Sequence, residues 1–352
     1  MAPIPKSMSG ILIEATGGPD QLHYKTDLPV PSLQDGEVLI RNEFIGVNYI
    51  DTYFRTGLYK SPLPFITGKE GAGTVLASRS PSFSEGDRVA YVSDKSYAEI
   101  TAVPATKAVR LPAGVTTEQG AAALLQGLTA LTFIREAAGI GASAHGVGED
   151  TPWTLVHAAA GGTGSLMVQM LSAFGLRVIG TAGTDDKCAR AKEHGAQWVI
   201  NNKTEDVRAR VMEITGGDGV DVIFDGVGKA TFDLDLDVVA RKGTLIVFGN
   251  ASGPVDPVNI LRLGAPGPAS TTAQPTKPSW SVARNVKLLR PVLFGYIATP
   301  EEWDKYTKEL FELIESGKVK LGVHNVYPLK DVAKAHEDLE GSKTTGKLLL
   351  KV

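Results

Sequence analysis

The stretch that decides the fold is Trp153-Thr-Leu-Val-His-Ala-Ala-Ala-Gly-Gly-Thr-Gly164, an apolar run that ends in three glycines. We expect a buried strand over residues 153–158 and an apolar helix over residues 165–174. From Ala159 the spacing is A-x-G-x-x-G, with alanine in place of the usual first glycine. Such a turn brings backbone N–H groups and a helix amino end close to a pyrophosphate. The stretch therefore predicts a dinucleotide-binding site, against the alternative that the glycines serve only a tight turn.

Strands and helices alternate on the carboxyl side of this turn. We expect strands at 177–181, 198–200, 220–224 and 244–248, with helices at 186–194, 205–214 and 232–239. This alternation predicts an α/β fold with a doubly wound parallel sheet. Residues 118–138 are expected to be helical with an interruption near Gly127, and 250–280 to be a long loop. The first 115 residues are β-rich and punctuated by proline and glycine, which is typical of a compact, partly closed β-structure.

Composition limits the classes of function. The chain has 352 residues, so two domains are expected, and its net charge of −3 argues against nucleic acid or a membrane surface as a partner. We find no apolar run long enough to span a bilayer and no targeting segment at the amino end. The single cysteine, Cys188, excludes an intrachain disulfide and a multi-cysteine metal site. A cytoplasmic protein is therefore expected.

The residues after the second Rossmann strand indicate which dinucleotide binds. An NAD-selective site has an acid about 20 residues after the glycine turn, to hold the ribose 2′-hydroxyl. Here Ala182 stands at that place, and Gly183, Thr184 and Lys187 follow. An uncharged strand end followed by a lysine favours a 2′-phosphate and hence NADPH. Helix capping would also explain Thr184, and a solvated helix surface would explain Lys187.

Several further motifs carry a family resemblance. They are Gly46-Val-Asn-Tyr-Ile-Asp-Thr-Tyr-Phe-Arg-Thr-Gly-Leu-Tyr59, Gly68-Lys-Glu-Gly-Ala-Gly73, Leu125-Gln-Gly-Leu-Thr-Ala130, Phe248-Gly-Asn-Ala-Ser-Gly253 and Arg290-Pro-Val-Leu-Phe-Gly-Tyr296. With these motifs, the glycine turn and the carboxyl end, Thr344 to Leu350, the chain resembles quinone oxidoreductases. These form the zeta-crystallin-like branch of the zinc-independent medium-chain dehydrogenases/reductases. The resemblance covers essentially the whole chain in order.

The resemblance implies a GroES-like catalytic domain, residues 1–130 with 296–352, and a Rossmann NADPH-binding domain, residues 131–295. Members are commonly homodimers, often joined through edge strands of the Rossmann domain. Zinc-dependent relatives bind a catalytic metal through a cysteine and a histidine, whose places here correspond to Asn48 and Lys69. An amide is a poor zinc ligand and a lysine is protonated at neutral pH, so no bound metal is expected.

The resemblance also implies the site residues. We expect Asn48, Tyr53 and Tyr59 around the nicotinamide and the substrate, with Asn48 and Tyr53 donating hydrogen bonds; ordinary aromatic packing is the alternative for both tyrosines. Cofactor contacts are expected from Asn48, Gln126, Thr129, Ala160, Gly161, Gly162, Thr163, Gly164, Gly183, Thr184, Lys187, Asn202, Phe248, Gly249, Asn250, Ser252, Phe294, Gly295 and Lys343. Asn202 replaces a tyrosine that the family often has at the 2′-phosphate, and Lys343 lies near the usual place of an arginine.

The expected reaction is transfer of reducing equivalents from NADPH to a quinone, with no metal. One alternative is a reductase of enones, alkenals or enoyl-thioesters, and another is a non-catalytic, crystallin-like or RNA-binding protein that binds NADPH.

Three other features have structural interpretations. His157 is expected to be a hydrogen-bonded core histidine and Asp225 to bind loop amides. Asp233, Asp235 and Asp237 are expected to form a solvated helix face.

Overall fold

The computed structural model describes residues 4–141, 151–265 and 283–352. These residues form two compact units. The first comprises Met1–Leu128, Thr299–Ser316 and Leu321–Val352, and the second comprises Thr129–Ala298 and Gly317–Lys320. Among the described residues, no helix is long and apolar enough to cross a membrane.

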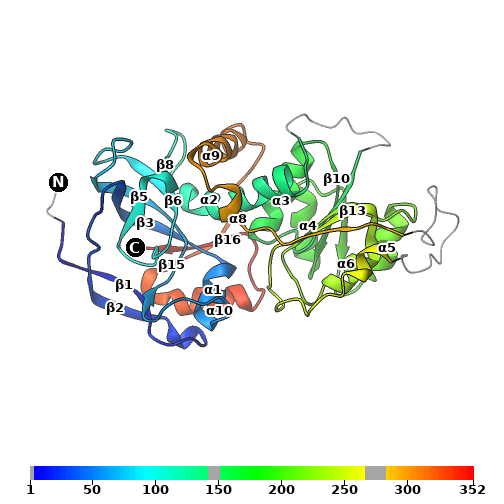
Figure 1. The fold of residues 1–352 in the computed structure, drawn as a ribbon, viewed down its shortest axis with the longest axis horizontal. Helices are drawn as coiled ribbons and strands as arrows, with labels where there is room; N and C mark the ends of the chain where they lie inside the picture. Colours follow the sequence, from blue (N-terminus) through cyan, green and yellow to red (C-terminus); the bar gives the residue numbers. More distant parts are fainter. Residues whose placement is uncertain (1–3, 142–150, 266–282) are drawn as a thin grey trace. The chain divides into compact units, whose positions relative to one another are not determined.

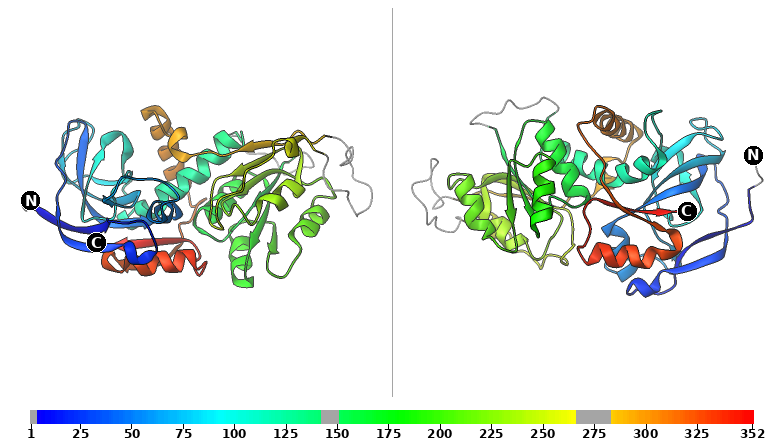
Figure 2. Two further views of the ribbon diagram at one scale, coloured as in Figure 1. Left: turned by 60° about the horizontal axis from the view of Figure 1, so that its bottom comes forward. Right: turned by 180° about the vertical axis from the view of Figure 1, so that it is seen from behind.

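The second unit contains a six-stranded parallel sheet (Figure 1). Its strand order is β11-β10-β9-β12-β13-β14, formed by Trp198–Asn201, Arg177–Ala182, Trp153–Val156, Val220–Asp225, Val239–Val247 and Lys287–Leu289. The connecting helices are α3 (Gly162–Ala173), α4 (Asp185–Glu193), α5 (Val207–Ile214) and α6 (Phe232–Val238). They cover both faces of the sheet (Figure 2). Fully buried Leu155, Ile179, Ile223 and Leu245 fill its core, as expected for strands covered on both faces. The predicted doubly wound sheet is confirmed.

Three sequence-based boundaries were wrong. Helix α3 begins at Gly162, not at residue 165, so two of the glycines lie inside its first turn. Strand β13 begins at Val239, five residues before the expected start, and so includes the last residue of the helix expected at 232–239. Helix α2 (Thr117–Thr132) runs without interruption through Gly127. Glycine is needed there for packing, since a Cβ atom at Gly127 would lie 2.8 Å from Cδ1 of Leu310.

The long loop expected at 250–280 falls partly outside the described residues, since residues 266–280 are not described. Within its described part, a short helix, α7, covers Leu261–Gly264.

The first unit contains two β-sheets. The larger has the order β15-β16-β3-β5-β6-β8, formed by Val323–Pro328, Lys347–Lys351, Glu37–Val47, Glu70–Ser78, Arg88–Val92 and Ala108–Arg110; β7 (Ile100–Pro104) also pairs with β3. The smaller has the order β2-β1-β4, formed by His23–Pro29, Ser7–Ile13 and Phe65–Ile66. Because β16 pairs with β3 from Leu348↔Val47 to Lys351↔Phe44, the last strand of the chain lies beside the strand that precedes Asn48.

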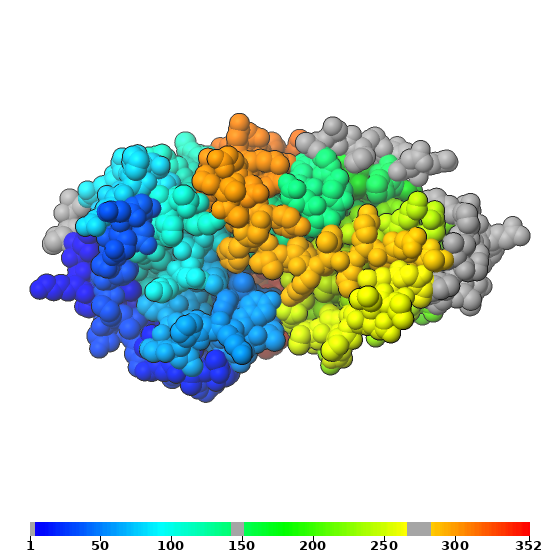
Figure 3. All heavy atoms as spheres, viewed as in Figure 1, coloured from blue at the N-terminus to red at the C-terminus, as the bar shows by residue number. Residues whose placement is uncertain are grey.

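Helices α1 (Tyr49–Thr56), α9 (Pro300–Glu315) and α10 (Val332–Glu340) also lie in this unit, together with the first part of α2. Helix α1 follows β3 directly, and α10 precedes β16. Helix α9, orange in Figure 3, begins with a capping box formed by Thr299 and Glu302. It buries Trp303, Tyr306, Leu310 and Leu313, while Ile314 is half-buried.

Candidate functional site

The glycine turn of the second unit is built so that backbone closely approaches backbone. Ala158, two residues after the end of β9, has φ +50°, and Gly161 is the N-cap of α3. A Cβ atom at Gly164 would lie 2.3 Å from the carbonyl oxygen of Ala158, so only glycine fits there. The amino end of α3 thereby presents Gly162 and Thr163 with backbone N–H groups that fit a pyrophosphate.

The residues predicted to bind the ribose 2′-phosphate lie at the ends of β10 and β11. Ala182 is buried, and Thr184 caps α4, its Oγ1 accepting a hydrogen bond of 3.3 Å from the backbone N–H of Lys187. Partial burial lowers the pKa of Lys187. Next to this turn, a Cβ atom at Gly183 would lie 3.5 Å from Oδ1 of Asn202. The structure thus brings together four of the residues predicted for the 2′-phosphate.

The same turn reveals a cation that sequence reasoning missed. Cγ and Cε of Lys203 lie 3.8 and 3.9 Å from the position of a Cβ atom at Gly183. The side chain of Lys203 is exposed, so it can offer its ammonium at this strand edge. Its place directly after Asn202 was the available signal, but the family pattern drew attention to residue 202 alone.

The loops after β12 and β13 pack against each other and are held by hydrogen bonds. Asp225 accepts bonds of 2.7 and 3.1 Å from the N–H groups of Val227 and Gly228, which confirms its predicted role. A Cβ atom at Gly249 would lie 2.0 Å from the carbonyl oxygen of Gly226, so the close approach requires glycine. Ser252 donates to the carbonyl oxygen of Val227 at 2.9 Å, so its hydroxyl holds the loop.

Arg290 fixes the end of β13 and was not predicted. Its guanidinium donates to the carbonyl oxygens of Val247 and Gly249 at 2.9 and 3.3 Å. Its signal was its place in the motif at 290–296, of which we singled out only residues 294 and 295. The neighbouring Phe248 lies 5.5 Å from the ring of Phe133, measured between centroids. The loop that includes Asn250 is therefore held at its start by Arg290 and at its end by Ser252.

The remaining predicted cofactor residues lie on three other segments. Gln126 and Thr129 are one turn apart on α2, and Phe294 and Gly295 are on α8 (Leu293–Tyr296). Lys343 follows α10 in the first unit, where its N–H donates to the carbonyl oxygen of Asp338.

A buried charged pair lies beneath the glycine turn, and one of its members corrects a prediction. Asp235 is fully buried, not part of a solvated face, and its Oδ1 lies 2.6 Å from Nε2 of His157. Nδ1 of the same imidazole lies 2.9 Å from Oγ1 of Thr181, so His157 is the hydrogen-bonded core histidine that we expected. Burial, together with the charge of the neighbouring Asp225, raises the pKa of Asp235 to about 6. Burial is the largest single effect and opposes protonation of His157, but the charge and hydrogen bond of Asp235, together with the charge of Asp225, outweigh it and raise the histidine's pKa.

In the first unit, Asn48 belongs to a buried network of charged and polar groups. Nζ of Lys347 donates to Oε2 of Glu70 at 2.5 Å and to Oδ1 of Asn48 at 2.7 Å. Nδ2 of Asn48 donates to Oε2 of Glu70 at 3.0 Å and to the carbonyl oxygen of Gly46 at 3.3 Å. The backbone N–H of Leu125 donates to Oε1 of Glu70 at 2.7 Å. Asn48, Glu70 and Lys347 are each at most 2% exposed.

This network concerns two expectations for Asn48: that it donates a hydrogen bond at the substrate site, and that it does not bind a metal. Both hydrogens of the Asn48 amide already have acceptors. To donate to a substrate oxygen, the amide must give up one of these two hydrogen bonds, of which the bond to the carbonyl oxygen of Gly46 is the longer. The amide oxygen faces an ammonium, which would repel a metal cation. Lys69, at the second position of the metal pair, forms an ion pair with Asp94. These donors do not fit zinc, and we derive no chemistry through a metal.

Aromatic rings surround the two tyrosines predicted for the substrate site. Tyr53 and Tyr59 have ring centroids 5.3 Å apart, and Phe54 packs edge-on against Tyr59 at 5.7 Å. Nζ of Lys69 lies 4.2 Å from the centroid of the Phe54 ring. We call these four residues the aromatic–lysine cluster. Tyr53 is 9% exposed and the other three are half-buried.

A second buried network holds α1 in place. Asp51 Oδ2 accepts from the backbone N–H of Asn48 and from the hydroxyl of Tyr97, both at 2.9 Å. Tyr97 has given away its one hydrogen, so Nε2–H of His336 donates to it, and Nδ1 accepts from Arg55 at 3.3 Å. Burial raises the pKa of Asp51 to about 7, and burial followed by the charge of Arg55 lowers the pKa of His336 to about 3.

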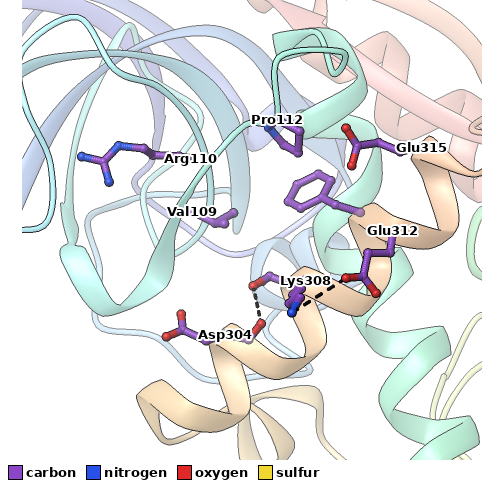
Figure 4. Close-up of a pocket in the computed structure, with 9 residues that line it drawn as sticks. Val109, Arg110, Pro112, Asp304, Lys308, Glu312 and Glu315 are labelled. Atoms are coloured by element: carbon purple, nitrogen blue, oxygen red, sulfur yellow. Dashed lines mark hydrogen bonds and ion pairs between the residues drawn. The ribbon is translucent and has the colours of Figure 1, made fainter. Parts of the chain in front are cut away.

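A surface hollow of about 440 Å³ lies elsewhere in the first unit, between β8 and α9 (Figure 4). Its lining includes apolar Val109 and Phe311 and charged Arg110, Glu312 and Glu315. It contains none of the predicted site residues.

Comparison with known proteins gives the family. Residues 34–113 match the alcohol dehydrogenase GroES-like domain, and residues 162–269 match the zinc-binding dehydrogenase family. A quinone oxidoreductase of Pseudomonas aeruginosa is 39% identical, over 97% of this chain and 98% of that protein. The chain belongs to the quinone oxidoreductases of the medium-chain dehydrogenase/reductase superfamily. This confirms the resemblance read from the motifs, and with it the GroES-like and Rossmann fold class.

The chain is also similar to two further proteins, an NADPH complex and a reductase of a different substrate. The crystal structure of Escherichia coli quinone oxidoreductase complexed with NADPH has a TM-score of 0.85 and 37% identity, and the match covers 98% of this chain and all of that one. A 2-haloacrylate reductase from a Burkholderia species is 32% identical, over 96% of this chain and 97% of that protein.

Proposed function

We propose that this protein is an NADPH-dependent quinone oxidoreductase that works without a metal. The observation that carries the proposal is the strand–turn–helix at Ala158–Gly164, where glycine backbone leaves room for a pyrophosphate at the amino end of α3. The relative complexed with NADPH supports the choice of cofactor. So does the strand end at Ala182, which has no acid and is followed by Lys187 and Lys203.

The residues of each unit have distinct proposed roles. In the second unit, Gly161–Gly164 hold the pyrophosphate, Gly183, Thr184, Lys187 and Asn202 hold the ribose 2′-phosphate, and the loop Phe248–Ser252 holds the nicotinamide half with Phe294 and Gly295. We assign Gln126, Thr129, Ala160 and Lys343 to the cofactor as well. In the first unit, Asn48, Tyr53 and Tyr59 position the substrate.

When bound, NADPH supplies a hydride, and a quinone that takes this hydride and one proton becomes a hydroquinone while the dinucleotide becomes NADP⁺. The protein's contribution is to hold the substrate in place and to stabilise the negative charge that develops on its oxygen. The edge-to-face pair of Tyr53 and Tyr59 suits a flat conjugated substrate, because aromatic rings pack well against each other at such distances.

The test is NADPH oxidation in the presence of an ortho-quinone, a para-quinone, a 2-alkenal and an enoyl-CoA, each with and without a chelator. We expect turnover of at least one quinone, undiminished by the chelator. Loss of activity with the chelator would overturn the metal-free assignment, and no turnover of either quinone would overturn the function.

A second candidate is reduction of an activated carbon–carbon double bond. The similarity to a 2-haloacrylate reductase favours it, since that substrate is an electron-poor alkene. In this case Tyr53 would supply the proton to the carbon next to the carbonyl. A higher kcat/KM for the 2-alkenal or the enoyl-CoA than for either quinone would favour this candidate.

We also propose that the protein is a cytoplasmic homodimer. Strand β14 lies at the end of the described strand order, and Val292, just beyond it, is 60% exposed. Ile260 and Leu261 are 75% and 76% exposed, which leaves apolar surface for a second copy. Light scattering that gives the mass of one chain would overturn the dimer, and cell fractionation tests the compartment.

A further inference from the structure

Lys69 places a positive charge at the edge of the aromatic–lysine cluster. Its ammonium lies 4.2 Å from the centroid of the Phe54 ring, and that ring packs edge-on against Tyr59. Tyr59 in turn packs against Tyr53. A cation and three aromatic rings are thus joined by direct contacts within the first unit.

The second partner of Lys69 is easily replaced. The lysine side chain is only 15% exposed, whereas its ion-pair partner, Asp94, is 68% exposed. Water and salt screen the exposed carboxylate of Asp94, which weakens this ion pair. A substrate oxygen that gains negative charge can therefore displace Asp94, while the contact with the Phe54 ring remains.

The backbone that carries Lys69 is rigid. Gly68 has φ +95°, and a Cβ atom there would lie 2.2 Å from Cδ1 of Tyr97, so the neighbouring segment fits closely against it. The carbonyl oxygen of Lys69 accepts from the N–H of Ser93 at 3.0 Å. The next residue, Glu70, is the centre of the buried network that holds Asn48. A charge on so fixed a backbone needs little reorganisation to act on a substrate.

We propose that Lys69 is a catalytic residue, whose ammonium hydrogen-bonds the substrate oxygen on which reduction places negative charge. Lys69 keeps its proton and provides only the hydrogen bond. The hydride and the further proton are those of the reaction above, so atoms and electrons balance without another reactant. This proposal rests on the proposed function, because it assigns Lys69 to the same substrate.

The first test compares three variants. Lys69→Met removes the charge at similar length, and Lys69→Arg keeps it. Lys107→Met is the matched control, because Lys107 is also half-buried and lies 5.9 Å from the centroid of the Trp303 ring in the same unit. We expect Lys69→Met to lose about 100- to 1,000-fold in kcat for a quinone, as for loss of one oxyanion donor. Lys69→Arg should retain most of the activity, Lys107→Met should match the wild type, and all three should melt near the wild-type temperature.

The second test does not depend on turnover. 4-Nitrophenol is an oxyanion probe whose ionised form absorbs visible light, so the pKa of the bound probe can be titrated on the whole enzyme. We expect wild type and Lys107→Met to lower this pKa and Lys69→Met to lose the shift. An unshifted probe on the wild type, or an equal shift on Lys69→Met, would overturn the proposal. If the probe behaves as expected but no quinone is reduced, the proposed function fails while Lys69 remains an oxyanion-binding residue.

Discussion

Replacing Lys347 by methionine tests the buried network around Asn48. Methionine fills much of the space of the lysine stem but leaves Glu70, which is fully buried, without its cation. Glu70 would keep the hydrogen bonds from the backbone of Leu125 and from Asn48, at 2.7 and 3.0 Å. Breaking a buried ion pair in this way costs about 3–5 kcal/mol. At about 2–4 °C per kcal/mol, the melting temperature should fall by on the order of 10 °C.

The double variant makes this reasoning sharper. Glu70→Gln alone leaves the Lys347 ammonium buried without a carboxylate and should also destabilise. Glu70→Gln combined with Lys347→Met removes both charges, while the amide oxygen introduced at position 70 can still accept from Leu125, so the double variant should be more stable than either single variant. Lys351→Met is the matched control, since it changes an exposed lysine on the same strand and should melt within about 2 °C of the wild type. Differential scanning calorimetry measures all four. A Lys347→Met variant as stable as the control, or costs that simply add in the double variant, would refute the account of the network.

Three further predictions concern the cofactor and pH. Lys203→Ala should raise the Kd for NADPH about tenfold, equivalent to ~1.4 kcal/mol, and leave the Kd for NADH unchanged. Fluorescence titration measures both constants, and an equal change in both would show that Lys203 does not bind the 2′-phosphate. Gly164→Ala should cost about 1–3 kcal/mol and weaken NADPH binding, because its Cβ atom would lie 2.3 Å from the Ala158 carbonyl oxygen; Gly264→Ala, which meets nothing within 4 Å, is the control. Asp51 has a folded-state pKa of about 7 against its ordinary 3.8, so between these pH values the native state binds a proton that the unfolded state has lost. The contribution of Asp51 to the free energy of unfolding therefore falls as pH rises from about 4 to 7. Asp51→Asn should therefore reduce the loss of melting temperature between pH 5 and pH 8; an unchanged loss would contradict this role.

Local patterns predicted the Rossmann sheet well. Apolar runs such as Val220–Phe224, separated by helical patterns, specify buried parallel strands without long-range information. The helix start at Gly162 was misplaced because glycine normally disfavours a helix interior. Here the close approach to the carbonyl of Ala158 requires glycine within the first turn.

Residues whose role depends on distant partners could not be predicted. Asp235 sits between Asp233 and Asp237, and helical periodicity cannot show that it meets His157, 78 residues away. Lys347 lies 277 residues from Glu70, and the pairing of β3 with both β16 and β5 brings them together. Charged residues are usually exposed, so nothing in the sequence marks these as buried.

The central claim is that this chain uses NADPH to reduce quinones. The most direct measurement is kcat/KM for one ortho-quinone and one para-quinone, each with NADPH and with NADH as the reductant. The account predicts turnover with at least one quinone and a clear preference for NADPH, which Lys203→Ala reduces. Equal rates with NADH, or no reduction of either quinone, would contradict it.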